Sequence, residues 1–275
     1  MEYRSDEQKE AESDTRRSAD TDRQEIEWQY DAPGGLERVE EWLVGGGSEE
    51  LARSGLAILK GSSKELVDTY YDTEDRRLYR AGYALRIRRK TPDGDPEATM
   101  KSLVSAGGAA GNLRKWREIS EKLKSDEVDA LSVAPGPVGG CLRELVGSRE
   151  VRRIFEVRTH RQTFDLMLAG QRFADPEKAL AGGSAGAARV GEVALDRSEI
   201  PLGTGAKPAH LARVDVEVDA SVTIASPELE DFVKTMERAL GLRPATTSKY
   251  EAGLFATGQS PNSIANLRGG ASEKE

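Results

Sequence analysis

The sequence predicts an α+β fold in which an antiparallel β-sheet closes into a barrel with a charged interior and helices on its outer face. Successive strand-like segments place apolar side chains on one face and charged side chains on the other. The charges are also segregated by strand, because three segments carry acids and a hairpin carries arginines and lysines. A polar lumen accommodates such faces, whereas a dry sheet interior does not.

One domain is expected at residues 23–257 of the 275-residue chain. Residues 1–22 carry many charges of both signs and few large apolar side chains, and residues 258–275 are rich in small and polar residues. Such segments bury too little apolar surface to offset the entropy lost on ordering, so we expect both to be disordered. Two Gly- and Ala-rich connectors, 105–112 and 175–188, interrupt the domain without dividing it.

The composition narrows the classes of function. Aspartate and glutamate outnumber lysine and arginine by 48 to 40, a net charge of −8, which argues against a general nucleic-acid binder. The single cysteine permits no internal disulfide, and no apolar run approaches the ~18 residues of a membrane span. We therefore expect a cytoplasmic protein that binds neither nucleic acids nor membranes. The sequence leaves its oligomeric state open.

The first predicted strand is EIEWQY, which puts Glu25, Glu27 and Gln29 on one face and apolar side chains on the other. The segment PGGLERVEEWL, residues 33–43, then predicts a helix with Pro33 in its first turn and an apolar stripe along one side. The GGG that follows is expected to end this helix.

A β-hairpin is predicted at residues 83–102, with the chain reversing at TPDGDP. Its first arm alternates Arg86 and Arg88 with apolar residues, and its second arm adds Lys101 to the charged side. We expect these three cations to point into the lumen. The later strands GEVALD and VDVEVD have acidic faces, which carry Glu192, Asp196, Asp215 and Glu217.

Two further helices are predicted. The clearer one is SPELEDFVKTMERALG, residues 226–241, with Ser226 as its N-cap, Pro227 in its first turn and Gly241 at its end. GGCLRELVG suggests a shorter helix. Each apolar stripe needs an apolar surface to cover, and the outer faces of the strands provide it.

Two interpretations fit the alternating strands. An antiparallel sheet with one face in water is the ordinary interpretation. The closed barrel is favoured because the charged faces are nearly pure in sign, whereas solvated faces use threonine, serine and glutamine freely. Carboxylates in a lumen require cations, and its arginines and lysines require anions. A divalent metal ion together with a polyphosphate would satisfy both.

The ordered series of motifs resembles the CYTH family, the triphosphate tunnel metalloenzymes. EIEWQY is similar to the ExExK signature that opens these domains, and YYDTEDRRLYRAGYALRIRRK, residues 70–90, is the more specific match. EATMKS, WREISE, RTHRQTF, GEVALD, VDVEVD and TTSKYEAG follow in the family's order, so the resemblance covers about residues 24–257. It implies an eight-stranded antiparallel barrel that encloses a tunnel for a triphosphate, with Mg²⁺ or Mn²⁺ as cofactor.

The resemblance also implies roles for single residues. It gives catalytic roles to Glu25, Glu27, Gln29, Arg117 and Glu118, the last two from the family's Arg-x-Glu-x-Glu strand. The phosphate-binding cations that it implies are Arg86, Arg88, Lys101, Arg161 and Lys249. The metal-binding carboxylates that it implies are Glu25, Glu27, Glu192, Asp196, Asp215 and Glu217.

Two positions depart from the family's pattern. Gln29 stands where the signature has lysine, so a charge-assisted contact to phosphate is replaced by a neutral hydrogen bond. In WREISE, Arg117 and Glu118 fall on opposite faces of a strand, so the Arg-x-Glu-x-Glu motif does not fit there in one register. We expect the neighbouring Trp116 to fill the layer outside the barrel.

These observations predict a metal-dependent triphosphatase, with inorganic triphosphate as the expected substrate. A first alternative keeps the fold and changes the reaction to that of a class IV-type adenylyl cyclase or a thiamine triphosphatase, so that the substrate is a nucleotide or thiamine triphosphate. A second alternative, left open by Gln29, is a module that binds polyphosphate or a nucleotide without turnover.

Overall fold

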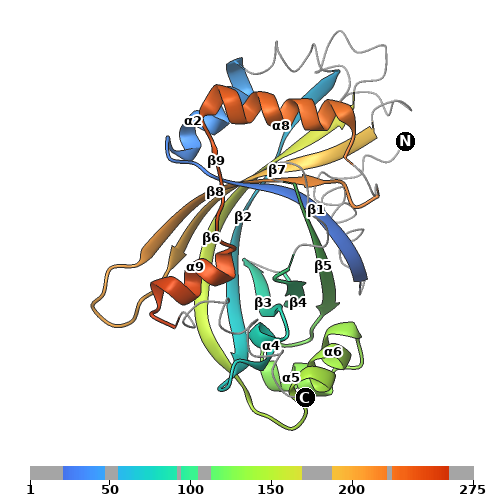
Figure 1. Ribbon diagram of the computed structural model, residues 1–275, viewed down its shortest axis with the longest axis vertical. Helices are drawn as coiled ribbons and strands as arrows, with labels where there is room; N and C mark the ends of the chain where they lie inside the picture. The colour runs from blue at the N-terminus through green and yellow to red at the C-terminus, as the bar shows by residue number, and fades with distance from the viewer. Residues whose placement is uncertain are drawn as a thin grey trace, which may run out of the picture.

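Eight antiparallel strands form a closed barrel (Figure 1). The computed structural model describes residues 21–46, 55–91, 94–104, 113–168, 188–221 and 225–259. The barrel strands are β1 (Thr21–Asp31), β2 (Leu56–Thr73), β3 (Tyr83–Thr91), β4 (Glu97–Ser102), β5 (Leu113–Lys122), β6 (Val151–Leu168), β7 (Ala188–Ile200) and β8 (Ala209–Val218).

The strand order closes the sheet on itself. Neighbours follow the sequence β5-β4-β3-β2-β6-β7-β8-β1, and β1 also pairs with β5. The predicted fold class is therefore confirmed, including the hairpin of β3 and β4. A two-residue strand, β9 (Arg243–Pro244), adds to β1. Because the barrel is closed, one face of every barrel strand is directed inward.

Strand β1 shows how alternation divides the side chains between the two faces. Ile26, Trp28 and Tyr30 are buried in an apolar core that also contains the apolar side chains of the helix Pro227–Leu240. Glu25 and Glu27 point the opposite way, toward the lumen. The predicted separation of apolar outer faces from charged inner faces is confirmed for this strand.

Two helices cover the outer side of β1, β7 and β8 (Figure 1). Helix α8 (Pro227–Leu240) begins at the predicted N-cap, where the Ser226 hydroxyl accepts a hydrogen bond from the Leu229 amide, and ends at Gly241 with φ 62°. Helix α2 (Leu36–Glu41) packs beside it in the same core. The apolar stripe of α8 is thereby removed from water, which stabilises this side of the barrel.

Helix α2 begins later than the sequence predicts. It starts at Leu36 rather than near Pro33, because Gly35 has φ 88° and its amide closes a turn onto the Ala32 carbonyl. The helix continues into a π-helical turn, η1 (Trp42–Gly46).

A second apolar cluster lies outside β3, β4 and β5. It is covered by α4 (Arg77–Arg80), α5 (Val128–Val133) and α6 (Pro137–Val146), near the lower end of the barrel in Figure 1. Leu85 of β3 and Leu142 of α6 are almost fully buried in it. The short helix predicted from GGCLRELVG is therefore present and begins two residues earlier, at Pro137, whereas sequence reasoning missed α4 and α5.

Helix α9 (Lys249–Ala256) packs on the lumen side of the wall. Tyr250 contacts Tyr70 of β2 and Phe155 of β6, with ring centroids 5.5 and 5.8 Å away. Tyr70 and Phe155 are register partners on the inner faces of their strands. Ser248 starts the helix with a complete capping box. Sequence reasoning missed this helix. Its first residue, Lys249, points into the lumen.

Several expectations concern residues outside the described part of the chain. These are the connectors at 105–112 and 175–187 and the terminal segments 1–20 and 260–275. Strand β1 begins at Thr21, two residues earlier than the expected domain boundary. Within the described ranges, no helix combines the length and the apolar character that a membrane crossing needs.

The docking of α9 can be tested at Gly253. The Phe155 ring lies where a Cβ would be, so Gly253→Ala must displace an aromatic side chain. We expect the free energy of unfolding to fall by about 1–3 kcal/mol, measured by urea denaturation. Gly140→Ala in α6 is the control, because open space surrounds that position and alanine should raise stability by up to about 1 kcal/mol. A Gly253→Ala variant as stable as the Gly140→Ala variant would contradict this packing.

Candidate functional site

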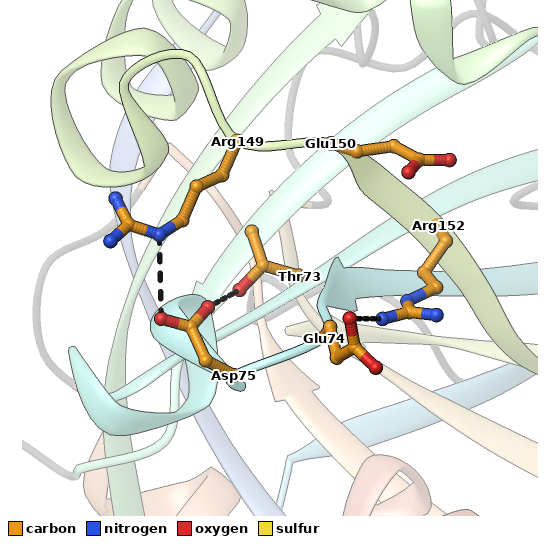
Figure 2. Close-up of a pocket in the computed structure, with 6 residues that line it drawn as sticks. All are labelled: Thr73, Glu74, Asp75, Arg149, Glu150 and Arg152. Atoms are coloured by element: carbon orange, nitrogen blue, oxygen red, sulfur yellow. Dashed lines mark hydrogen bonds and ion pairs between the residues drawn. The ribbon is translucent and has the colours of Figure 1, made fainter.

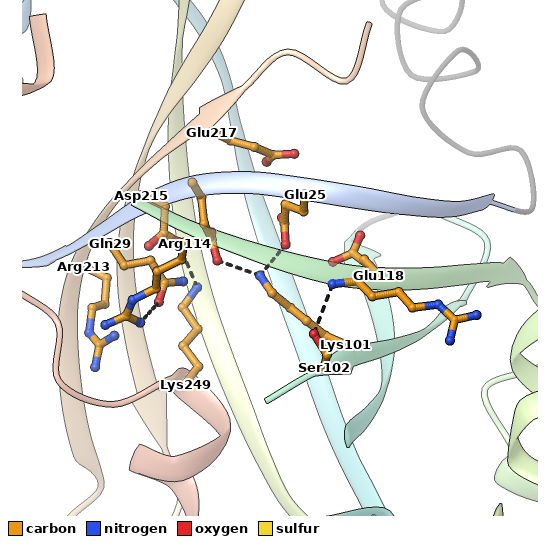
Figure 3. A network of polar contacts seen from close by, with 12 residues as sticks. Glu25, Gln29, Lys101, Ser102, Arg114, Glu118, Arg213, Asp215, Glu217 and Lys249 are labelled. Carbon is orange, nitrogen blue, oxygen red and sulfur yellow. Dashed lines mark hydrogen bonds and ion pairs between the residues drawn. The ribbon is translucent and has the colours of Figure 1, made fainter. Parts of the chain in front are cut away.

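Lys101 of β4 lies between two carboxylates of β1. Its ammonium is 2.8 Å from Glu27 Oε1 and also contacts the Glu25 carboxylate (Figure 3). Both glutamates are buried. Burial opposes the charged form of Lys101, but Glu25 and Glu27 hold its pKa above the usual range. The structure thus brings together one predicted phosphate-binding cation and two predicted metal-binding carboxylates.

Arg23 of β1 bridges two further carboxylates. Its Nη2 lies 3.1 Å from Glu118 Oε1 and 3.4 Å from Glu217 Oε1. Sequence reasoning selected both glutamates but not Arg23. The available signal was its spacing, because Arg23 lies two residues before Glu25 and therefore shares its face.

Three glutamates lie side by side across β1, β8 and β7. In the strand register Glu27 is opposite Glu217, and Glu217 is opposite Glu192. The pKa of Glu217 is raised, first by burial and then by the repulsion of Glu118, Glu27 and Glu192, although Arg23 opposes this shift. This row therefore holds more negative charge than the neighbouring cations compensate.

The pKa values of Glu25 and Glu118 move in opposite directions. Burial raises the pKa of Glu25 well above its usual range, and Glu118 adds repulsion. Burial also acts on Glu118, but Lys101, Arg86 and Arg23 together hold its pKa below the usual range. Glu118 is therefore ionised at neutral pH, whereas Glu25 is the carboxyl that binds a proton more readily.

Arg86 and Arg88 of β3 are directed inward, as predicted, and share one carboxylate. Arg88 forms a bidentate pair with the fully buried Asp68 of β2, at 2.7 and 2.8 Å, and Arg86 lies 3.8 Å from it. Burial disfavours the Asp68 carboxylate, yet the two arginines hold its pKa far below the usual range. Sequence reasoning missed Asp68, because it is a lone acid between Leu66 and Tyr70 on its face of β2.

Arg161 of β6 and Lys249 of α9 meet at Asp196 of β7. The guanidinium forms two bonds of 2.6 Å to the fully buried carboxylate, and the ammonium contacts it as well. Burial works against the charge of Asp196, but both cations hold its pKa far below the usual range. The structure therefore binds this predicted metal ligand tightly to two predicted phosphate-binding residues.

Asp215 of β8 is less well compensated. Its Oδ2 lies 3.5 Å from Arg161 and 3.9 Å from Lys249, while its buried Oδ1 has no hydrogen-bond partner. Burial raises its pKa, and the nearby Asp196 and Glu27 carboxylates add to the shift. An unsatisfied buried carboxylate oxygen is an acceptor without a donor, and a bound cation would stabilise it.

Glu192 of β7 is held by an arginine that sequence reasoning missed. Arg189 Nη2 lies 2.9 Å from Glu192 Oε2, and the same guanidinium contacts Asp165 and Asp219 at 2.5 and 2.6 Å. Arg189 and Glu192 lie on opposite sides of a register shift between β6 and β7. Their pairing therefore could not be deduced from simple alternation.

Gln29 lies beside another arginine that was not selected from the sequence. Arg114 Nη1 of β5 donates a 3.0 Å hydrogen bond to Gln29 Oε1 (Figure 3). The neighbouring Trp116 also faces the lumen, since it is the register partner of Glu25, and its ring lies 5.7 Å from the Lys101 ammonium. The expectation that Trp116 fills the outer layer is therefore wrong.

Arg117 does not belong to this cluster. Its guanidinium makes bonds of 2.8 and 3.1 Å to Asp22, and its side chain is about half exposed. Glu118, the next residue, faces the lumen, so the two lie on opposite sides of β5. We leave Arg117 out of the site for this reason.

A surface pocket of about 320 Å³ lies elsewhere, between the end of β2 and the start of β6 (Figure 2). Thr73, Asp75 and Arg149 line one part of it, and Glu74 pairs with Arg152 at 2.7 Å. None of the residues predicted to form the site lines this pocket. Its charges are largely paired with one another at the protein surface.

The fold and the charged lumen define a triphosphate-tunnel type of barrel. The CYTH domain model matches residues 43–251, well over half of the chain. The chain therefore belongs to the CYTH family, as its motifs predict. No curated protein sequence matches it.

Solved structures share the fold at low sequence identity. A Bacillus halodurans protein, described as a suggested adenylate cyclase, is 18% identical with a TM-score of 0.50, over 85% of this chain and 98% of that chain. A Hippeastrum protein, suggested to be an adenylyl cyclase and described as having a dominant triphosphatase activity, is 13% identical with a TM-score of 0.48, over 86% and 98% of the two chains. The likeness to the Bacillus halodurans protein concerns the fold alone.

Divalent-cation binding should depend on pH. Glu25, Asp215 and Glu217 have raised pKa values, so without metal these three groups bind protons more tightly in the folded state than in the unfolded chain. The stability that they contribute therefore falls as pH rises through those values. A metal ion needs the deprotonated groups. We therefore expect the increase in Tm caused by Mg²⁺ or Mn²⁺ to grow from about pH 5 to about pH 8, measured by calorimetry.

Two glutamine variants complete that experiment. Glu217→Gln should reduce the metal-induced increase, because it removes one oxygen donor. Glu40→Gln is the control, since Glu40 is an exposed residue of α2 that pairs with Lys60 outside the barrel. A metal-induced increase in Tm that is the same across the pH range, or absent at every pH, would contradict the prediction that these carboxylates bind a divalent metal ion.

Proposed function

We propose that this CYTH protein is a metal-dependent triphosphatase that hydrolyses inorganic triphosphate, or a related triphosphate, inside the barrel. One observation carries the proposal: the lumen brings a group of acids and a group of cations from different strands into direct contact. Arg86, Lys101 and Arg161 each lie within 4.0 Å of a buried carboxylate. Such a lumen is suited to a ligand that carries both kinds of charge.

The present pairing explains how both groups would be used. Lys101 forms ion pairs with Glu25 and Glu27, and Arg161 forms one with Asp196. A polyphosphate would offer these cations several oxygen acceptors of higher charge density. The acids that lose their partners would then need another cation. Triphosphate and a divalent metal ion should therefore each bind more favourably when the other is present.

The residues fit Mg²⁺ or Mn²⁺ in their donor chemistry. All are carboxylate oxygens, the ligands that hard divalent ions prefer, and Asp215 Oδ1 is buried without a partner. Among the described residues no group of three or more acidic, histidine or cysteine side chains already forms a metal site. Lys101 and Arg23 lie between the glutamates that would have to approach one another. The carboxylates proposed to hold metal are Glu25, Glu27, Asp215 and Glu217.

The remaining predicted acids have different surroundings. Asp196 forms ion pairs with Arg161 and Lys249, and Glu192 forms one with Arg189. We assign them to positioning those cations rather than to direct metal binding. A bound divalent ion would supply neutralisation of phosphate charge and a water of lowered pKa. The arginines and lysines of the chain would align the phosphates. Such alignment, together with charge stabilisation, accounts for most of the catalysis of phosphoanhydride hydrolysis.

A binding module without turnover is the second candidate. Gln29 gives this strand no cation at the position where the family signature has one. Every step of binding described above would still occur if hydrolysis were too slow to matter. The two candidates therefore differ in rate and not in affinity, and only a turnover measurement separates them.

Turnover should depend on Glu27. We expect phosphate release from inorganic triphosphate with Mg²⁺ or Mn²⁺, none with EDTA, and a loss of at least about a hundredfold in kcat/KM for Glu27→Gln. Glu40→Gln should keep the activity of the parent protein. A panel with ATP and thiamine triphosphate would reveal the other reactions. Tight triphosphate binding with no release from any compound would favour the binding module, and full activity of Glu27→Gln would refute the metal assignment.

A further inference from the structure

Arg114 differs from the other arginines and lysines described at the site. Its guanidinium donates to the Gln29 side-chain oxygen at 3.0 Å and also contacts the Ala245 carbonyl oxygen. No carboxylate of the described residues lies within ion-pair distance of it. By contrast, Arg161 makes two bonds of 2.6 Å to a single aspartate. Arg114 is therefore a half-buried cation whose charge is held by neutral groups only.

Trp116 supports Arg114 without cancelling its charge. The guanidinium carbon lies 5.9 Å from the centroid of the Trp116 ring, and the Lys101 ammonium lies 5.7 Å from it. An aromatic face attracts a cation through its quadrupole but brings no negative charge. The Trp116 Nε1–H group is itself buried without a hydrogen-bond partner. The lumen face of β5 thus carries one uncompensated cation and one unused donor, two residues apart.

The neutral side chain at position 29 is part of the same arrangement. A lysine there would repel Arg114, and a glutamate would neutralise it, whereas the Gln29 amide oxygen orients the guanidinium and leaves its charge available. Arg114 is the register partner of Glu27, so this charge lies beside the acids of β1. A partly desolvated cation with no counter-ion is stabilised by an anionic ligand. The planar guanidinium matches phosphoryl oxygens better than an ammonium does.

We propose that Arg114, oriented by Gln29 and Trp116, is a substrate-binding residue that takes phosphoryl oxygens of the triphosphate in the lumen. This assignment rests on the proposed function for the identity of the anion. It adds a residue on β5 to the cations expected from the sequence. Arg114 also supplies the positive charge that position 29 lacks, from the neighbouring strand rather than from β1.

Binding of inorganic triphosphate, measured by isothermal titration calorimetry in EDTA, tests this assignment without requiring turnover. We expect Arg114→Gln to weaken binding by about tenfold or more, because one charge-assisted contact is lost. Arg114→Lys should retain most of the affinity, since the charge remains. Arg89→Gln is the control, because Arg89 lies on the outer side of β3 and pairs with Asp126. It should bind triphosphate as the parent protein does.

The outcomes separate this assignment from the proposed function. Thermal unfolding of each variant first establishes that it is folded, and Arg114→Ala, which also removes the charge, replaces Arg114→Gln if that variant is not folded. Parent protein that binds triphosphate but releases no phosphate when Mg²⁺ or Mn²⁺ is supplied, with weaker binding by Arg114→Gln, would refute the triphosphatase and support the role of Arg114. Equal affinity of folded Arg114→Gln and parent protein would overturn the role of Arg114 alone. If the parent protein binds triphosphate only with Mg²⁺, the same comparison of variants is made with Mg²⁺. Absence of triphosphate binding by the parent protein under both conditions would overturn both assignments.

Discussion

Neutralisation of charge inside a closed barrel is the constraint on which the rest of this structure depends. A strand wall that directs every second side chain inward leaves those side chains no bulk water to face. Here many inward positions are acids, arginines and lysines, and most of these charges pair with a partner on another strand. Lys101 of β4 meets Glu27 of β1, and Arg88 of β3 meets Asp68 of β2. The strand order decides which of these pairs can form.

The same alternation determines the outer layers. Each strand that points charge inward points leucine, valine or aromatic side chains outward, and these would be exposed without a cover. Helices α8 and α2 provide one cover and α5 and α6 provide another, over different strands of the barrel. Helix α9 lies on the inner side, where Tyr250 contacts Phe155 and Lys249 reaches Asp196. The helices therefore divide into those that bury apolar surface outside and one that completes the lumen.

Alternation along single strands was enough to predict much of the fold and part of the site. It placed Glu25, Glu27, Arg86 and Arg88 on inner faces, because a period of two is a local property of the sequence. Pairing between strands is not local. Asp68 is the partner of two arginines some twenty residues away in sequence, and nothing near it indicates that role.

Errors arose where residues were chosen by resemblance to a motif rather than by their face. Arg117 was selected because the family has an arginine on this strand, yet its neighbour Glu118 faces the lumen and Arg117 cannot. Read by alternation instead, β5 presents Arg114, Trp116 and Glu118 inward. The same rule would have placed Trp116 correctly and revealed Arg23. The face of the strand on which a side chain lies therefore limits its possible role at the site more strictly than its residue type does.

Gln29 shows why a departure from a motif need not remove its chemistry. Judged along β1 alone, glutamine for lysine deletes one positive charge from the lumen. In the closed barrel, β5 lies beside β1, and Arg114 reaches the Gln29 side chain from there. A ligand in the lumen interacts with a charge according to its distance, whichever strand supplies that charge, since the Coulomb energy of two charges depends on their separation at a given dielectric. The quantity that matters for binding in such a tunnel is therefore the balance of charge across neighbouring strands, and a motif read on one strand records only part of it.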